Sequence, residues 1–421
     1  MVSMDPKPFL TSIFRAAVAA ADPQRTIGSH LPARPKGRTI VVGAGKGAAQ
    51  MAAAFENLWE GPLEGLVVTR YGYGAPTQRI KIIEAAHPVP DEAGVQAAQQ
   101  LLALVKGLSE DDLVVALVCG GGSALLPAPA GSLTLADEIA VNEALLASGA
   151  PISVMNMVRK HVSSIKGGRL AAAAFPARVV SLIVSDIPGD NPALVASGPT
   201  VPDAASRADA LKAIATYGIQ LPQAVMAHLE TAQADAPAPD DECFSRNEVK
   251  LIASAAVSLE AAANEAKRQG IEAVILSDSI EGEAREVGSV HAAIVREIAS
   301  RNRPFARPVL LLSGGETTVT LRAKGKGGRN TEFLLSFALG IDGFDGIDAL
   351  AADTDGIDGS EDNAGAFCNG QTIGRMRAVG IDARAMLSAN NAWTAFEATG
   401  DLFVPGPTGT NVNDFRAIWV R

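Results

Sequence analysis

Short runs rich in Val, Ile and Leu alternate along the chain with Ala-rich stretches. The runs predict strands and the Ala-rich stretches predict helices. Because the predicted strands are apolar on both faces, they are typical of parallel sheets covered by helices. The predicted strands are 39–42, 65–69, 80–85, 113–119, 179–185, 249–254, 273–277, 309–313, 317–322 and 347–352, and the predicted helices are 8–20, 47–58, 94–106, 136–147, 153–165, 208–217, 257–269, 285–298 and 331–339.

One segment, 231–241, divides this pattern. Its sequence, TAQADAPAPDD, consists mostly of small, acidic and proline residues that cannot pack a core, and a new series of strands and helices follows it. We therefore predict an α/β fold of two domains, 1–235 and 242–421, the first built on a doubly wound sheet. Since ligands of such sheets bind outside the carboxyl ends of the strands, the loops after the strands are the candidate sites.

Composition narrows the class of protein. The 421 residues carry 36 Lys and Arg against 46 Asp and Glu, and this acidic balance argues against a nucleic-acid partner. Three widely spaced cysteines form neither a disulfide framework nor a zinc motif, which fits a reducing compartment. The longest uncharged stretch, 113–136, contains three consecutive glycines and two prolines, so it predicts a strand and a loop instead of a membrane span. We expect a cytoplasmic protein.

The first candidate loop follows strand 39–42 and opens a helix. Gly43, Gly45, Lys46 and Gly47 lie within G-x-G-x-x-A, which matches a dinucleotide-binding fingerprint in the right context. The acidic residue expected about 20 positions later is missing, because the next strand ends at Arg70. Free N–H groups at a helix N-terminus, together with the lysine, would instead favour an anion. A tight turn with a solvated lysine is the alternative.

Two further loops in the first half combine glycines, hydroxyls and carboxylates. Gly121, Gly122 and Ser123 follow strand 113–119, where glycines let a backbone approach a ligand closely; a flexible turn is the alternative. Asp186 and Asp190 lie in a loop that contains prolines 188, 192 and 199. Carboxylates there could bind magnesium or accept a proton from a substrate hydroxyl, although Asp, Gly, Asn and Pro are also ordinary turn residues.

Two loops in the second half carry charge. Residues 313–318, which include Glu316, predict a β-turn, and Lys324, Lys326 and Arg329 follow in a glycine-rich loop before a helix. This basic loop predicts an anion site in which Arg329 clamps phosphoryl oxygens, with a solvated hairpin tip as the alternative. Lys46 and Arg329 both stand on glycine loops with little core to support, so losing either side chain is not expected to cost more than ~1 kcal/mol of stability.

The second acidic loop contains Asp353 and Asp355 and follows strand 347–352. It could meet a metal, a ribose or a substrate hydroxyl, and a plain acidic turn is as good an interpretation. His87 is a candidate loop ligand. Basic residues also gather at 159–161 and 166–169, where a structural role near a helix C-terminus is favoured.

Nine stretches, in order along nearly the whole chain, resemble the glycerate 2-kinase family, whose C-terminal part is called the MOFRL domain. They are VGAGKGA (42–48), HPVPDEAG (87–94), CGGGSALL (119–126), MNMVRKHVSSIKGGRLA (155–171), VSDIPGD with ASGPT (184–200), LSGGETTV (312–319), GKGGRNTEF (325–333), ADTDGIDG (352–359) and GPTGTNVND (406–414).

The resemblance implies an N-terminal Rossmann-like domain, a C-terminal α/β domain with a mixed sheet, and an active site in the cleft between them. It further implies that ATP and Mg²⁺ serve to phosphorylate D-glycerate at its 2-hydroxyl, in a protein that could form a homodimer. Carried onto this sequence, it points to Lys46, the Asp186/Asp190 loop and Arg329 as the functional polar set. We assign Lys46, Asp190 and Arg329 as catalytic and Asp186 and Asp190 as magnesium ligands, with either aspartate open as the base. The expected substrate- and nucleotide-binding residues are Gly43, Gly45, Gly47, Gly121, Gly122, Ser123, Glu316, Lys326, Asn330, Asp353 and Asp355.

Two other functions remain open at this point. Some members of the family have carried the label hydroxypyruvate reductase, and the G-x-G-x-x-A match with Arg70 fits an NAD(P)H-dependent enzyme. The lysine in the fingerprint and the lack of a His–carboxylate pair argue against that activity. A sensor that binds a nucleotide or a sugar acid without catalysis would need the glycine loops, but Asp190 and Arg329 would then be surplus.

Overall fold

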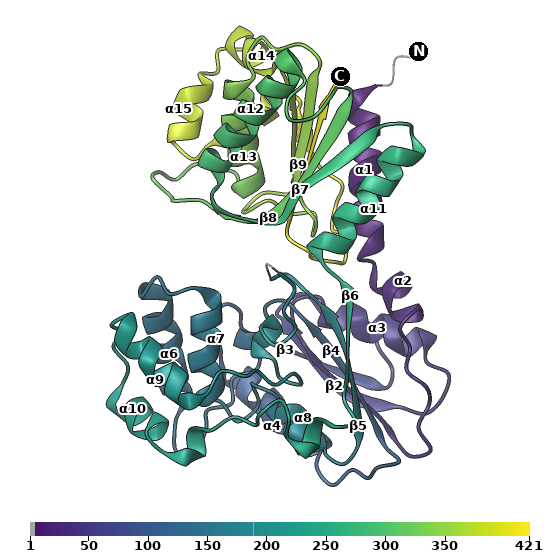
Figure 1. Ribbon diagram of the computed structural model, residues 1–421, viewed down its shortest axis with the longest axis vertical. Coiled ribbons are helices and arrows are strands. Elements are labelled where there is room, and N and C mark those ends of the chain that lie inside the picture. The colour runs from purple at the N-terminus through teal and green to yellow at the C-terminus, as the bar shows by residue number, and fades with distance from the viewer. Residues whose placement is uncertain (1–4, 188) are drawn as a thin grey trace. The chain divides into compact units, whose positions relative to one another are not determined.

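The computed structural model describes residues 5–187 and 189–421 and divides the chain into two compact units (Figure 1). The N-terminal unit is Pro23–Ile252, and the C-terminal unit combines the segment up to Asp22 with Ala253–Arg421. Each unit is built on its own six-stranded sheet. Among the described helices, none has both the length and the apolar composition needed to cross a bilayer.

The sheet of the N-terminal unit has the strand order β3-β2-β1-β4-β5-β6, and the pairs from β3 to β5 are parallel. The strands are β1 (Thr39–Ala44), β2 (Glu64–Arg70), β3 (Ile80–Ala85), β4 (Leu113–Cys119), β5 (Arg178–Val184) and β6 (Glu248–Ala253). The order reverses between β1 and β4, which pair with each other at the middle of the sheet. Loops that follow these two strands therefore flank the point where such sheets bind ligands.

Helices cover both faces of this sheet. On one face α4 and α8 bury Ala97, Leu101 and Leu170 against the strands, and α3 packs beside β1, β2 and β4. A separate helical group, formed by α6, α7, α9 and α10, has its own core around Val141 and Ile214. The helices of the unit are α2 (Pro23–Gly28), α3 (Ala48–Leu58), α4 (Glu92–Leu104), α5 (Gly122–Leu125), α6 (Leu135–Ala147), α7 (Ile152–His161), α8 (Arg169–Ala174), α9 (Arg207–Thr216) and α10 (Gln223–Leu229), and the 3-10 turns are η1 (Val195–Ser197), η2 (Ala232–Ala234) and η3 (Glu242–Phe244).

The sheet of the C-terminal unit is mixed, with the order β11-β10-β9-β12-β8-β7. β7 and β8 are parallel, whereas β12 is antiparallel to both β8 and β9. The strands are β7 (Glu272–Glu283), β8 (Val309–Thr318), β9 (Ile347–Asp353), β10 (Gly365–Asn369), β11 (Leu402–Phe403) and β12 (Asp414–Val420). The helices are α1 (Pro6–Ala20), α11 (Ala255–Arg268), α12 (Ala284–Arg301), α13 (Arg329–Gly340), α14 (Thr372–Ala378), α15 (Ala383–Ser388) and α16 (Ala392–Glu397).

The first helix, α1, completes the core of the C-terminal unit, where it lies beside α11 (Figure 1). The ring of Phe9 lies 4.8 Å from that of Trp419 on β12, and Phe14 meets Phe403 and Phe415 edge to face. Such aromatic pairs add to the free energy of burial itself. α1 thus packs with the C-terminal unit, whereas the domains predicted from composition, 1–235 and 242–421, grouped it with the first half.

The predicted two-domain α/β fold, doubly wound in the first half and mixed in the second, is confirmed. The turn predicted at 313–318 and the strand at 317–322 are wrong, because β8 runs unbroken from Val309 to Thr318. Its two glycines mark a close approach of strands instead of a turn: Gly315 has a φ of +128°, and a Cβ there would overlap the backbone of Ile280 on β7. The cleft between the domains remains a prediction.

Candidate functional site

Polar side chains stand at the carboxyl ends of five neighbouring strands in the N-terminal unit. Lys46 follows β1, Arg70 ends β2, His87 follows β3, Ser123 follows β4 and Asp186 follows β5. Because the carboxyl ends of parallel strands meet at one edge of a sheet, these residues share that edge. We call these five residues the strand-end site.

Lys46 is held by its backbone and left unpaired at its ammonium group. Its N–H donates to the carbonyl of Gly120 at 2.8 Å, and the Thr69 hydroxyl donates to its carbonyl at 3.1 Å. Among the described residues, the half-buried Lys46 side chain forms no ion pair. Gly121 leaves room for it, because a Cβ there would stand 2.9 Å from Lys46 Cγ and 3.1 Å from His87 Nε2. A fixed lysine without a carboxylate partner is suited to an anionic ligand.

His87 is neutral at pH 7 and lies near the positive charges of Lys46 and Arg70. Burial lowers its pKa to about 4, and the nearby charges of Lys46 and Arg70 act in the same direction. The Arg70 guanidinium lies 3.6 Å from the centroid of the Tyr73 ring and, within the described chain, has no carboxylate within ion-pair distance. The strand-end site therefore carries two cations that an anionic group could neutralise.

The glycine loop after β1 does not supply the backbone donors predicted for it. The N–H groups of Gly45 and Lys46 donate to the carbonyls of Val68 and Gly120, Gly47 donates to the Cys119 sulfur, and the next N–H returns to Gly45. Four consecutive donors are thus used inside the protein, so this part of the prediction is wrong. Since a dinucleotide pyrophosphate needs these donors, the geometry also weakens the match to the dinucleotide fingerprint.

A chain of hydrogen bonds fixes Ser123. Its hydroxyl lies 2.8 Å from that of Ser197, and the Ser197 hydroxyl donates to Asn156 Oδ1 at 2.9 Å. Because the Ser197 hydroxyl donates its hydrogen to Asn156, the Ser123 hydroxyl is the donor in its bond with Ser197. Asn156, on α7, is itself oriented by its Nδ2, which donates to the Leu194 carbonyl at 3.1 Å.

The two predicted magnesium ligands differ in their surroundings. The Asp186 carboxylate lies against Gly120, and a Cβ at that position would displace it. Asp190 adopts a φ of 53°, and its N–H donates to the Ile187 carbonyl. Within the described chain, the Asp190 carboxylate accepts no hydrogen bond. Pro188, one of the prolines expected to stiffen the loop, lies outside the described residues.

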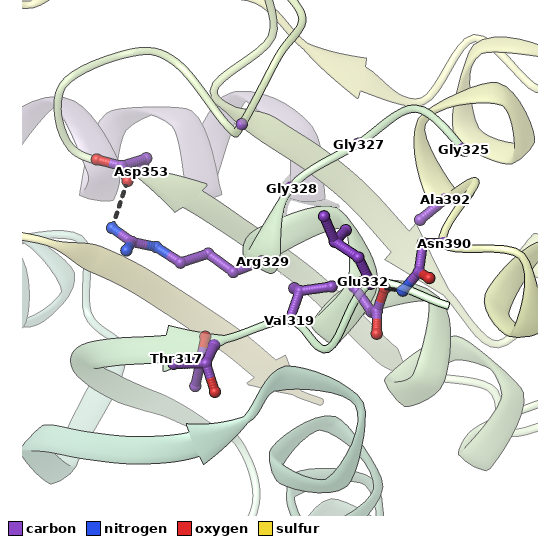
Figure 2. A pocket seen from close by; sticks show the side chains of 13 residues that line it. Thr317, Val319, Gly325, Gly327, Gly328, Arg329, Glu332, Asp353, Asn390 and Ala392 are labelled. Atoms are coloured by element: carbon purple, nitrogen blue, oxygen red, sulfur yellow. Dashed lines mark hydrogen bonds and ion pairs between the residues drawn. The ribbon is translucent and has the colours of Figure 1, made fainter. Parts of the chain in front are cut away.

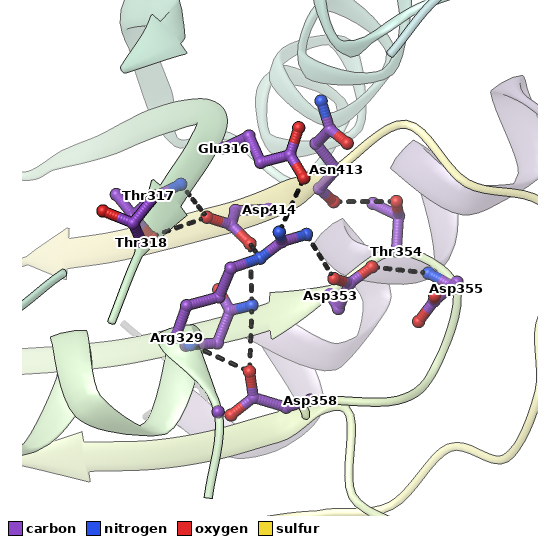
Figure 3. Close-up of polar contacts among 12 residues, drawn as sticks. Glu316, Thr317, Thr318, Arg329, Asp353, Thr354, Asp355, Asp358, Asn413 and Asp414 are labelled. Atoms are coloured by element: carbon purple, nitrogen blue, oxygen red, sulfur yellow. Dashed lines mark hydrogen bonds and ion pairs between the residues drawn. The ribbon is translucent and has the colours of Figure 1, made fainter. Parts of the chain in front are cut away.

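In the C-terminal unit, three carboxylates surround Arg329 (Figure 3). Its Nε donates to Asp414 at 2.6 Å, its Nη1 to Glu316 at 2.8 Å and its Nη2 to Asp353 at 2.8 Å. Burial opposes the charge of the guanidinium, but the three carboxylates outweigh it and raise the pKa of Arg329. The sequence predicts few supporting contacts for this side chain. That prediction is wrong, because Arg329 forms ion pairs with three carboxylates.

A buried carboxylate occupies the start of α13, the helix that carries Arg329. Asp358 accepts hydrogen bonds from the N–H groups of Asn330 and Thr331 at 2.9 and 2.8 Å. Lys326, in the preceding loop, pairs with Glu361 at 3.3 Å. Lys326 and Arg329, two of the three cations of the predicted anion site, are thus already compensated within the protein.

The second acidic loop joins the same network. Burial raises the pKa of Asp353 well above its usual range, and the neighbouring Asp355 adds to this effect. The Asp355 N–H donates to Asp353 at 3.1 Å. Asp414 behaves oppositely: burial would raise its pKa, but Arg416 and Arg329 lower it. Asp353 therefore takes up a proton more readily than Asp414.

A cavity of about 540 Å³ opens beside this network (Figure 2). Its volume is in the range of small-molecule sites. Glu332 in its wall is neutralised by Arg285, whose Nη2 lies 2.6 Å away, and accepts from Asn390 at 2.9 Å. The cavity is lined by Thr317, Thr318, Val319, Leu321, Gly325, Gly327, Gly328, Arg329, Glu332, Asp353, Gly359, Asn390 and Ala392.

His291, on α12, gives the C-terminal unit a pH dependence. Its Nε2 lies 3.1 Å from the Ser313 hydroxyl, and burial lowers its pKa to about 4. The unfolded chain takes up this proton near pH 6.5, so stability falls as pH drops from about 6.5 to 4, by at most about 1.4 kcal/mol per pH unit. We expect His291→Gln to flatten this slope in urea unfolding at pH 7 and pH 5. Equal slopes for both proteins would contradict this assignment.

Two models of protein families match different parts of this chain. A model described as a domain of unknown function, DUF4147, matches residues 9–230, and a model of the MOFRL family matches residues 309–414. A protein of Agrobacterium vitis named "Putative hydroxypyruvate reductase" is 54% identical over 98% of this chain and 94% of its own length. The "Glycerate 2-kinase" of Pyrococcus horikoshii is 40% identical over 98% of this chain and 97% of its own length. The crystal structure of a glycerate kinase from Thermotoga maritima matches 99% of both chains, with a TM-score of 0.90 and 37% identity.

The chain belongs to the glycerate 2-kinase family. The range matched by the first model contains the whole strand-end site, and that of the second contains Arg329 with its three carboxylate partners. In this member of the glycerate 2-kinase family, the structure brings together Lys46, the loop of Gly121, Gly122 and Ser123, and Asp186.

Sequence reasoning missed several partners of these residues. Arg70 was considered only as a cofactor contact, and Asn156 and Ser197, although they lie in stretches that resemble the family, were given no role. Asp414 was also missed, although it ends the last stretch that resembles the glycerate 2-kinase family. Asp414 stands at the start of β12, next to β9 and β8. This position results from antiparallel pairing of strands far apart in the sequence, which no local sequence pattern indicates.

Proposed function

We propose that this chain transfers the γ-phosphoryl group of ATP to the 2-hydroxyl of D-glycerate. The observation that carries the proposal is the Lys46 ammonium at the strand reversal, which forms no ion pair within the described residues and packs against the same glycine loop, 120–122, that Asp186 contacts. Glycerate 2-kinases from Pyrococcus horikoshii and Thermotoga maritima, related to this chain at 40% and 39% identity, support the activity.

Phosphoryl transfer depends on cations around the moving group and on an oriented hydroxyl. Lys46 and Arg70 supply positive charge at one edge of the sheet, and neutral His87 adds none. In this proposal Lys46 binds the transferred phosphoryl group, and Asp186 or Asp190 accepts the proton of the substrate hydroxyl. The Rossmann-like strand order of the N-terminal unit supports a ligand at this edge.

Mg²⁺ fits the donor set of this loop. In the described chain no group of three or more metal-ligating side chains gathers. Mg²⁺ in kinases typically takes one or two carboxylates together with substrate phosphates, so Asp186 and Asp190 suffice. Those two residues would hold the ion, which when bound neutralises charge on the phosphates of ATP.

The roles of the two carboxylates can be separated by amide substitution. A residue that accepts the proton loses kcat as Asn at every Mg²⁺ concentration, whereas a residue that only binds the ion is partly rescued by high Mg²⁺. We expect Asp190→Asn to lower kcat about 100-fold or more without rescue, which places the base there. Steady-state assays of Asp186→Asn and Asp190→Asn across a magnesium titration test this. Rescue of Asp190→Asn would assign it to the metal instead.

A reductase is the second candidate, because relatives in Agrobacterium vitis carry that name. Parallel assays separate the two functions: release of ADP from MgATP with D-glycerate, and loss of NADH or NADPH absorbance with hydroxypyruvate. We expect the first and not the second, since the N–H groups of Gly45, Lys46 and Gly47 are already used. Nicotinamide oxidation that Gly45→Val abolishes, without any ADP release, would overturn the kinase proposal.

A further inference from the structure

α7 carries a cation, Arg159, that forms no ion pair with any residue the structure describes. Arg159 is half-buried, its Nε donates to Asn142 Oδ1 at 2.7 Å, and its Nη1 donates to Asn156 Oδ1 at 3.2 Å. Both partners are neutral amides. Among the residues that the structure describes, Arg159 has no carboxylate within 4.0 Å, and its Nη2 makes no hydrogen bond.

Two neighbouring lysines are paired and Arg169 donates to four backbone carbonyls, which sets Arg159 apart. Lys160, the next residue, forms an ion pair with Asp203, and Lys166 forms one with Glu138. Glu138 also accepts from the Ala128 N–H at 3.0 Å, so its carboxylate is committed to other donors. Burial lowers the pKa of Arg159, and the opposing charge of Glu138 does not outweigh this effect. An anionic group of a bound ligand would offset the desolvation cost of the buried Arg159 charge.

The hydrogen bonds of Arg159 lead directly to the strand-end site. Asn156 Oδ1 accepts from both Arg159 and Ser197, and the Ser197 hydroxyl lies 2.8 Å from that of Ser123. Ser123 follows the glycine loop that accommodates Lys46. Arg159 is therefore connected through two side chains to the loop where phosphoryl transfer is proposed.

We propose that Arg159 binds the carboxylate of the acceptor substrate. The inference rests on the proposed function, since D-glycerate presents a carboxylate next to the hydroxyl that would react. A guanidinium with free N–H groups binds a carboxylate bidentately and fixes its orientation, which a lysine cannot do. Arg159 is thus the residue that selects hydroxy acids over uncharged polyols.

Direct binding of D-glycerate, measured by calorimetry without ATP, tests the assignment in Arg159→Met and Arg159→Lys. We expect the Kd and KM for glycerate to rise about 10- to 100-fold in Arg159→Met, with a smaller rise in Arg159→Lys, while the KM for ATP stays within about twofold. Arg207→Met is the matched control, because Arg207 is in the same unit and pairs with Asp235. The control should bind glycerate like the wild type.

A measurement on the wild-type protein avoids any folding defect of the variants. Phenylglyoxal modifies arginine, and mass spectrometry can follow its reaction at Arg159. We expect saturating D-glycerate to slow this modification and glycerol to leave it unchanged. Equal modification rates with and without glycerate, or an unchanged Kd in Arg159→Met, would overturn the inference even if the chain phosphorylates glycerate. Arg159-dependent glycerate binding without phosphorylation would instead overturn the proposed function alone.

Discussion

Lys46→Ala is expected to lower kcat for glycerate phosphorylation by two to three orders of magnitude. Removing one well-placed electrostatic donor from a phosphoryl- or acyl-transfer site costs about 2–4 kcal/mol of transition-state stabilisation. Because the Lys46 ammonium forms no ion pair within the described residues, its loss should change the free energy of unfolding by less than about 1 kcal/mol. Steady-state kinetics and urea unfolding of the same preparation measure both quantities.

Lys36→Ala is the matched control for this prediction. Lys36 is an exposed lysine of the same unit, and its removal should leave kcat unchanged. Near-normal kcat in Lys46→Ala would show that Lys46 belongs to an ordinary turn, and the glycine loop before Ser123 would be the next place to look. A large loss of stability would show that the ammonium supports the fold.

Arg329→Ala is expected to destabilise the C-terminal unit by about 3 kcal/mol or more. The guanidinium is only 23% exposed, and its removal leaves Asp353 and Asp414 buried with less positive charge around them. Breaking a buried pair by removing one partner typically costs about 3–5 kcal/mol, because the remaining charge is uncompensated. Urea unfolding followed by the fluorescence of Trp393 and Trp419, both in the C-terminal unit, measures the loss.

Two comparisons isolate the cause of this loss. Arg268→Ala removes an exposed arginine of the same unit that pairs with Glu265, and it should cost less than about 1 kcal/mol. Adding Asp353→Asn to Arg329→Ala should recover part of the stability, because it removes a carboxylate left unpaired. Equal stabilities of Arg329→Ala and the wild type would contradict the network. A lower kcat in Arg329→Ala therefore indicates a catalytic role for Arg329 only under conditions in which the variant is folded.

The placement of Lys46, Ser123 and Asp186 at one edge of the sheet could be predicted, because it follows from parallel pairing. Apolar runs located the strands β1 to β5, and any residue just after such a strand lies at the same edge of the sheet. Lys46 and Asp186, 140 positions apart, could thus be assigned to one region before any contact was known. What the pattern could not give is the backbone bonding, which uses the N–H groups of Gly45 to Gly47 inside the protein.

The network around Arg329 shows why the second half was harder to predict. Its carboxylate partners come from β8, β9 and β12, and the pairing of these strands is antiparallel and distant in sequence. β12 contains a buried Asp414 and a buried Arg416, so its polar residues hid the strand from a hydrophobicity pattern. Arg329, which was predicted to be a free cation, is instead the centre of an ion-pair network with three carboxylates.

Phosphorus NMR of the product shows whether this chain phosphorylates D-glycerate at its 2-hydroxyl. A phosphate on carbon 2 couples to one neighbouring proton and gives a doublet, whereas a phosphate on carbon 3 couples to two and gives a triplet. After incubation with MgATP and D-glycerate, we predict a new doublet that is absent with Lys46→Ala. A triplet would move the reaction to the 3-hydroxyl, and the absence of any new phosphate ester across a range of pH and metal ions would show that the chain is not a glycerate kinase.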